Sequence, residues 1–130
     1  DTVRVEYFPR SSSNERMEEF ARNLPVFARV AGFQLHLGAP FSAWKENPES
    51  HLLPLIRRID EQVLGTAPKV EAIHGGLETG LFYAVAPHLD IVSVGPDTHN
   101  IHSANESVDL DSCARLAAII AGTLTELTKL

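Results

Sequence analysis

Two short apolar segments in the second half of the chain each lead into a loop of glycine and polar residues. The first, residues 69–73, precedes the turn HGGLETG at 74–80, and the second, residues 90–94, precedes a polar loop at 95–107. Short apolar runs bounded by turn residues are typical of buried strands. In an open α/β sheet, ligands bind beyond the carboxyl ends of the strands. The pattern therefore predicts an α/β sheet whose edge carries part of a ligand site.

Periodicity along the rest of the chain predicts two more strands and four helices. The strands are expected at 2–8 and 33–37, and the helices at 17–31, 52–63, 77–85 and 110–127. Ser12 and Glu15 form a capping-box pattern before the first helix, and Pro25 should kink that helix or end it early. The order of elements, β-α-β, a hinge and then α-β-α-β-α, is that of an α/β protein.

The segment 38–50 predicts a boundary between two structural parts, because its glycine, prolines and serines give it the composition of a linker. The β-α-β part before the boundary buries little apolar surface by itself. Unpaired strand edges are templates for pairing with another chain, so we expect a homodimer that associates through residues 2–8 or 33–37.

Composition excludes several classes of function. With 130 residues, the chain is one ordinary domain or pieces of two, and a hydrophobic content of 44% allows a real core. A formal net charge of −6 argues against nucleic acid as a partner, since a phosphate-binding face needs a basic cluster. The single cysteine, Cys113, excludes an intrachain disulfide and fits a reducing cytoplasm. No apolar run is long enough to span a membrane, and a start at Asp1 without Met is what we expect of a fragment.

Two motifs carry a resemblance to a known family. The strings HGGLETGLF at 74–82 and PHLDIVSVGPDTHNIHSANE at 87–106 resemble the carboxyl-terminal part of the aminoacyl-histidine (Xaa-His) dipeptidases, which belong to the zinc-dependent aminoacylase and carboxypeptidase superfamily. That family shows HAGLECG, then a strand ending in SIGP, and then HSP followed by Asp or Asn and Glu. This chain departs from the pattern at Gly75, Thr79 and Ala104, and none of these changes removes a metal-ligating side chain.

The resemblance implies a division of the chain into two partial domains. Residues 1–40 would be the β-α-β remnant of an inserted lid or dimerisation domain. Residues 45–130 would be the carboxyl-terminal segment of a zinc-peptidase-like catalytic α/β domain. The other metal ligands and the general base would come from an amino-terminal catalytic segment that is missing here, so we expect the isolated chain to be inactive.

His102 is the first candidate site residue, and it lies just past a predicted strand in a polar loop. The residues alone leave open an exposed loop histidine or a zinc ligand, since imidazole is the commonest nitrogen ligand of zinc in proteins. The resemblance implies the second reading, because His102 matches the last metal ligand of the family's dinuclear site. A ligating histidine usually bonds its other ring nitrogen to an acceptor, and the carboxylate of Glu106 or Asp97 could serve.

Gly75, Gly76 and Glu78 form the second candidate site. A simple strand-to-helix turn would explain the glycines, and Glu78 in the first helical turn complements the helix dipole. Alternatively, the bare backbone N–H groups receive an anionic or polarised group, and Glu78 binds the α-amino group of a substrate. The resemblance implies that this turn lines the substrate pocket.

Arg10 is the third candidate, and it follows the first predicted strand. A solvated turn would explain it, but arginine also recognises carboxylates through a planar, bidentate fork. The resemblance implies that a lid arginine near this place binds the terminal carboxylate of the substrate.

Taken with these residues, the resemblance implies a metal-dependent dipeptidase that hydrolyses Xaa-His or similar short peptides, and we expect it to be cytoplasmic. The resemblance implies two divalent metals, zinc with manganese or cobalt as alternatives, and a metal-bridging hydroxide that attacks the scissile carbonyl. The alternatives are a related tripeptidase, deacylase or carboxypeptidase of the same superfamily, and a non-catalytic module that dimerises.

Overall fold

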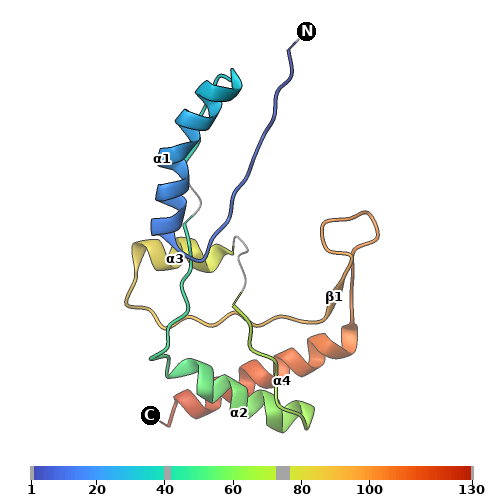
Figure 1. Cartoon of the computed structure of the whole chain (residues 1–130). Coiled ribbons are helices and arrows are strands. Elements are labelled where there is room, and N and C mark those ends of the chain that lie inside the picture. Colours follow the sequence, from blue (N-terminus) through green and yellow to red (C-terminus); the bar gives the residue numbers. More distant parts are fainter. Residues whose placement is uncertain (1, 40–41, 73–76, 130) are drawn as a thin grey trace. The chain divides into compact units, whose positions relative to one another are not determined.

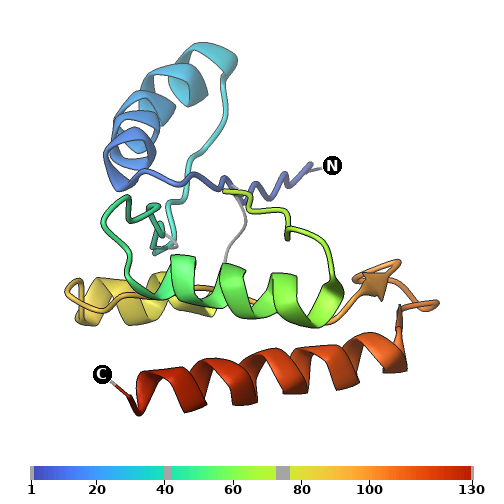
Figure 2. The ribbon, with the colours of Figure 1, turned by 90° about the horizontal axis from the view of Figure 1, so that it is seen from below.

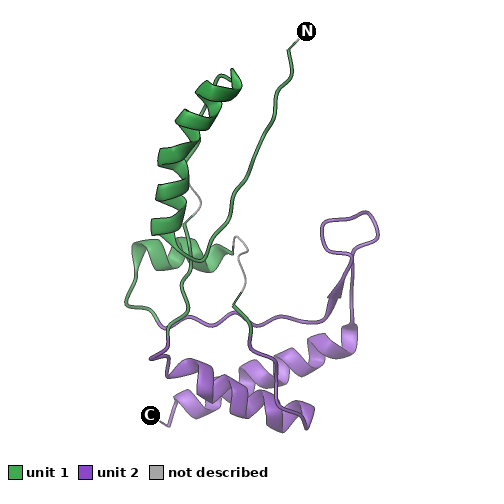
Figure 3. Cartoon of the chain, in the orientation of Figure 1, with its two compact units in different colours: residues 1–47, 71–89 green, residues 48–70, 90–130 purple. Residues whose placement is uncertain are grey.

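The computed structural model describes residues 2–39, 42–72 and 77–129 (Figure 1). The described elements are the helices α1 (Asn14–Ala31), α2 (Leu52–Leu64), α3 (Glu78–Val85) and α4 (Leu110–Leu127), and the strands β1 (Thr98–His99) and β2 (Ser107–Val108). The chain divides into two compact units, residues 1–47 with 71–89 and residues 48–70 with 90–130 (Figure 3). The predicted division at residues 40 to 45 stays a prediction.

The helices agree closely with the periodicity of the sequence. α1 ends at Gly32, which adopts the left-handed conformation with φ of 73°, and its N-cap is Ser13 instead of the predicted Ser12. The Oγ of Ser13 accepts a hydrogen bond from the backbone N–H of Arg16 at 3.3 Å, which satisfies one of the free donors of the first turn. α1 also runs past Pro25 to Ala31, so the early stop, one of the two outcomes predicted for Pro25, does not occur.

The predicted strands differ from the structure. Residues 2–8, 33–37 and 90–94 form neither helix nor strand, and the prediction at 69–73 extends into residues outside those described. A strand exists through hydrogen bonds to a neighbour, and within the described residues the only ladder joins β1 to β2 in an antiparallel pair. The apolar residues of the first segment stay exposed, and Val3 is 80% exposed. The alternation of apolar and polar residues therefore indicated segments suited to a sheet, but it did not show which neighbouring strand each would pair with.

In the second unit, α2 and α4 lie side by side and form the core (Figures 1 and 2). Ile56 and Ile59 of α2 and Ile119 of α4 are buried together. Gly122 allows a close approach, because a Cβ built there would lie 2.8 Å from Cγ2 of Ile59. The small residue on α4 thus fits the branched residue on α2.

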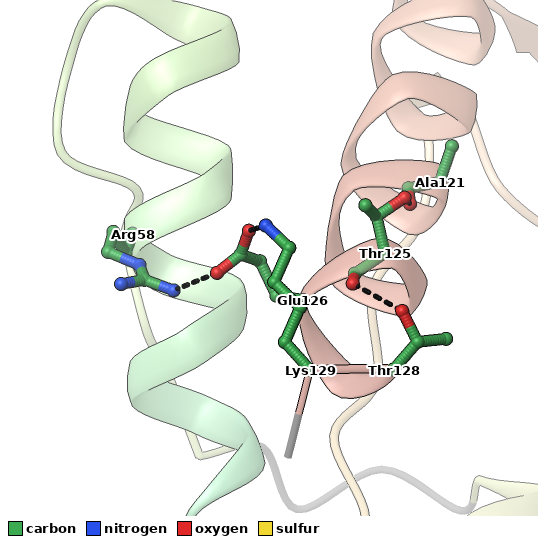
Figure 4. Close-up of polar contacts among 6 residues, drawn as sticks. All are labelled: Arg58, Ala121, Thr125, Glu126, Thr128 and Lys129. Atoms are coloured by element: carbon green, nitrogen blue, oxygen red, sulfur yellow. Dashed lines mark hydrogen bonds and ion pairs between the residues drawn. The ribbon is translucent and has the colours of Figure 1, made fainter.

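Near its carboxyl end, α4 makes a polar contact with α2 that Figure 4 shows in close-up. Arg58 of α2 donates to Glu126 of α4 at 3.1 Å, and Lys129 bonds the same carboxylate. The hydrogen bond and the charge of Lys129 are the main causes of a lowered pKa of Glu126; desolvation opposes them, and Arg58 lowers the pKa further. Because solvent screens this exposed ion pair, it contributes more to the alignment of the two helices than to their stability.

The amino terminus of α2 is capped by a residue far along the chain. Asp90 Oδ2 accepts hydrogen bonds from the backbone N–H groups of His51 and Leu52, each at 2.8 Å. Partial desolvation alone would raise the pKa of Asp90, but hydrogen bonds from Ser50, Leu52 and His51 outweigh it and lower the pKa below its usual value. The N-cap position itself, His51, makes no side-chain cap bond, so Asp90 ties segment 90–94 to α2.

The first unit is held by contacts at the start of α1. The side-chain oxygen of Asn14 accepts a hydrogen bond from the backbone N–H of Ala43 at 2.8 Å. Ala43 is buried, and so is Gly80 of α3. A Cβ at Gly80 would collide with the backbone oxygen of Ser42, so α3 packs directly on segment 42–43. None of the helices in the described ranges is both long and apolar enough to cross a membrane.

We predict that Gly122→Ala destabilises the chain. Alanine improves helix propensity by about 1 kcal/mol, but overpacking against the stiff, β-branched Ile59 costs about 1–3 kcal/mol. Urea unfolding should show a net loss, and Gly95→Ala, which has open space around its Cβ, is the control. A Gly122→Ala chain that is more stable than wild type would show that α2 and α4 do not approach this closely.

Removing the tertiary cap of α2 should lower stability in a pH-dependent way. Asp90→Ala removes the carboxylate oxygen that accepts hydrogen bonds from two backbone N–H groups and should cost about 1 kcal/mol at pH 7. Because the folded pKa of Asp90 is lowered, its contribution is present above the unfolded pKa of about 3.9 and disappears as the pH falls through the folded value. Denaturant unfolding between pH 7 and pH 3 measures this difference. If Asp90→Ala lowered stability equally at pH 7 and at pH 3, the charge of the Asp90 carboxylate would not contribute to the cap.

Candidate functional site

The candidate metal ligand His102 lies in the loop of a short β-hairpin in the second unit (Figure 1). β1 and β2 pair Thr98 with Val108 and His99 with Ser107, which closes the loop over residues 100–106. His102 is exposed and lies near the middle of this loop. The hairpin therefore presents the imidazole to solvent, where an incoming ligand can reach it.

Hydrogen bonds within the loop give it a defined shape. The N–H of Ser103 donates to the carbonyl of Asn100 at 3.1 Å, and the N–H of Glu106 donates to the carbonyl of Ser103 at 3.2 Å. The N–H of Asn105 bonds Oγ of Ser103 at 3.2 Å. Asn100 and His102 both have positive φ, 52° and 65°, a region that few non-glycine residues occupy but in which Asn and His are enriched.

Glu106 holds the backbone of His102. Its Oε2 accepts a hydrogen bond from the N–H of His102 at 3.1 Å. The sequence suggested that Glu106 or Asp97 would accept a bond from the imidazole ring. The structure instead gives Glu106 a bond to the backbone amide of His102, and it pairs Asp97 with Arg115 at 3.1 Å.

The base of the hairpin is fixed to the amino terminus of α4. The backbone N–H of Asp97 donates to Oγ of Ser112 at 2.9 Å, and the N–H of Asp109 donates to the carbonyl of Asp97 at 2.9 Å. Ser112 is buried and bonds the N-cap residue Asp109 twice, through its N–H at 2.8 Å and its hydroxyl at 2.6 Å. Sequence analysis missed Ser112 and Arg115.

The other predicted site residues belong to the first unit or fall outside the description. Gly75 and Gly76 lie outside the described residues. Glu78 is the first residue of α3 and is exposed, a position that complements the helix dipole. Arg10 is exposed, and its guanidinium donates to the carbonyl of Pro9 at 3.2 Å.

The described residues do not by themselves assemble a metal centre. In the part of the chain that the structure describes, no group of three or more His, Cys, Asp or Glu side chains could hold a metal ion. His102, the one residue predicted as a metal ligand, lies on a loop that hydrogen bonds order.

Comparison with known proteins identifies the family. Residues 23–126 match peptidase family M20/M25/M40, so the chain belongs to this peptidase family. The resemblance stated from the motifs is confirmed, and with it the α/β fold class.

Two relatives make the similarity more specific. The cytosol non-specific dipeptidase of Escherichia coli (strain K12) is 25% identical over 127 residues, which is 98% of this chain and 26% of that protein. The crystal structure of aminoacylhistidine dipeptidase from Vibrio alginolyticus matches with a TM-score of 0.70 and 30% identity, over 90% of this chain and 24% of that one. The chain therefore spans about a quarter of the length of these relatives.

Proposed function

We propose that this chain is part of a metal-dependent dipeptidase that hydrolyses Xaa-His or similar short peptides. The observation that carries the proposal is the family match together with two relatives that are both named as dipeptidases. The name of the relative with the known structure favours substrates with a carboxyl-terminal histidine. The name of the other relative supports the proposal of a cytoplasmic location.

His102 is the residue of this chain that would hold a metal. Its exposed imidazole on a hydrogen-bonded loop fits a nitrogen ligand of zinc, with manganese or cobalt as alternatives. Two divalent metals at such a site polarise the scissile carbonyl and activate water. The remaining ligands and the general base would come from a segment that precedes this chain in the complete enzyme.

The residues of the first unit would recognise the ends of the peptide. Arg10 would bind the terminal carboxylate through its guanidinium fork, since it is always charged and exposed. Glu78, with Gly75 and Gly76 before it, would line the pocket and neutralise the α-amino group. Under this proposal, Arg10 and Glu78 would bind the two charged ends that every dipeptide has.

Homodimerisation of this protein is part of the proposal. Four large side chains of segment 2–8 are 72–80% exposed, an apolar surface that a second copy could cover. The same observation favours the alternative in which the chain is a non-catalytic dimerising module. Tripeptides, N-acyl amino acids and carboxypeptidase substrates belong in the same assay, because a preference for one of them would replace the dipeptidase assignment.

We expect the complete enzyme to lose activity when His102 is replaced. His102→Ala should lower kcat by at least about 100-fold, since loss even of an outer residue that supports a ligand costs 10–100-fold. Turnover of a Xaa-His dipeptide at saturating zinc is the measurement, and the exposed His36→Ala is the matched control. Unchanged turnover in His102→Ala would remove His102 from the metal site.

The 130-residue chain alone should not hydrolyse dipeptides with any added divalent metal. One histidine cannot hold and activate water at a two-metal site. Purified chain and complete enzyme are compared with the same dipeptide in zinc, manganese and cobalt. Zinc-dependent turnover by the purified chain would contradict the view that further ligands lie outside it.

A further inference from the structure

We propose that Glu106 is a positioning residue that holds His102 in its left-handed backbone conformation and so aims the imidazole before a metal binds. The inference rests on the proposed metal role of His102 and adds to it a specific residue and contact. The contact is the bond of 3.1 Å between the N–H of His102 and Oε2 of Glu106.

The conformation of His102 needs such support. A φ of 65° places it in the left-handed region, which costs an L-residue on the order of 1–2 kcal/mol relative to a right-handed conformation. Asn100, two residues earlier, lies in the same region with φ of 52°. Left-handed conformations at two positions this close in the chain persist only where contacts with surrounding residues hold the backbone in place.

Glu106 is well placed to supply that contact. A carboxylate oxygen is a good acceptor for a backbone N–H, and Oε2 of Glu106 lies within hydrogen-bond distance of the His102 N–H, at 3.1 Å. The backbone of Glu106 is itself fixed, because its N–H bonds the carbonyl of Ser103 and Ser107 pairs with His99 in the ladder. The carboxylate therefore reaches back across the loop from a fixed point.

The other polar side chains of the loop serve different parts of it. Oγ of Ser103 accepts from the N–H of Asn105, and the amide of Asn100 reaches the carbonyl of Asn105 at 3.5 Å. These contacts close the far side of the loop, whereas Glu106 bonds the amide of the candidate ligand. Loss of the Glu106 carboxylate should thus release His102 while the base of the hairpin at Asp97 and Ser112 stays anchored.

The test compares Glu106→Ala with Glu106→Gln in the complete enzyme. Glutamine keeps a side-chain oxygen that can accept the His102 N–H, but it loses the charge and the ability to act as an anionic ligand. Zinc affinity is measured by competition with a chromophoric chelator, and kcat and KM are measured with a Xaa-His dipeptide. Glu61→Ala, an exposed carboxylate on α2, controls for loss of negative charge.

We expect Glu106→Ala to weaken zinc binding about 10–100-fold and to lower kcat with little change in KM. Glu106→Gln should bind zinc within about threefold of wild type, since it restores the acceptor. Glu61→Ala should bind zinc like wild type. Zinc affinity of Glu106→Ala equal to wild type would overturn the proposal, and so would a loss in Glu106→Gln as large as in Glu106→Ala, which would assign Glu106 to the metal itself.

A second readout without metal separates this inference from the proposed function. Hydrogen exchange of the metal-free enzyme should speed up in a peptide spanning residues 97–109 in Glu106→Ala, with no change in the melting temperature. Glu106→Gln should keep the slow exchange. If exchange responds as expected but His102→Ala binds zinc normally, the positioning stands and the metal role fails. Unchanged exchange in Glu106→Ala, or a general fall in melting temperature, overturns the positioning.

The double variant His102→Ala/Glu106→Ala completes the comparison. Because Glu106 acts through His102, the double variant should bind zinc no more weakly than His102→Ala alone. An additional loss of affinity in the double variant would show that Glu106 acts on the metal independently of His102.

Discussion

The contact between α2 and α4 is the interaction on which the second unit depends. Ile56, Ile59 and Ile119 are its buried centre, and Gly122 lets the two helices approach. Segment 90–97 is then fixed at both ends, since Asp90 caps α2 and Asp97 bonds Ser112 at the start of α4. The hairpin that carries His102 begins from the second of these points, so the helix pair determines where its base lies within the unit.

The helices could be predicted from the sequence because their signals are local. The apolar spacing lies within each helix, and the observed caps Gly32, Gly65 and Asp109 lie directly beside their helices. The Asp90 cap could not be predicted, because Asp90 lies 39 positions from His51 and 38 positions from Leu52 in the sequence. The strand predictions at 2–8, 33–37 and 90–94 were wrong for the same physical reason, since alternation is a property of one segment and a ladder requires two.

The candidate site was predictable to a different extent. The motifs identified the family, whereas the metal role of His102 and the substrate roles of Glu78 and Arg10 stay predictions. The structure adds that all three residues are exposed. The bond between Glu106 and the amide of His102 depends on the register of β1 with β2 and on positive φ angles, which no spacing rule gives. Spacing rules also do not give the contacts of Asp97 with Ser112 and Arg115, because these partners lie 15 and 18 positions away in the sequence.

A fixed loop changes where the cost of ordering His102 falls. Ordering one residue's backbone costs about 1–2 kcal/mol, and a ligand on a mobile loop would bear that cost when the metal binds. In this hairpin, the register of the ladder, the turn at Ser103 and the Glu106 bond order the backbone during folding. During folding, the contacts that anchor the hairpin to α4 offset the cost of ordering the loop backbone. Under the proposed function, metal affinity then depends on a residue that need not touch the metal, which is why the Glu106 variants separate positioning from ligation.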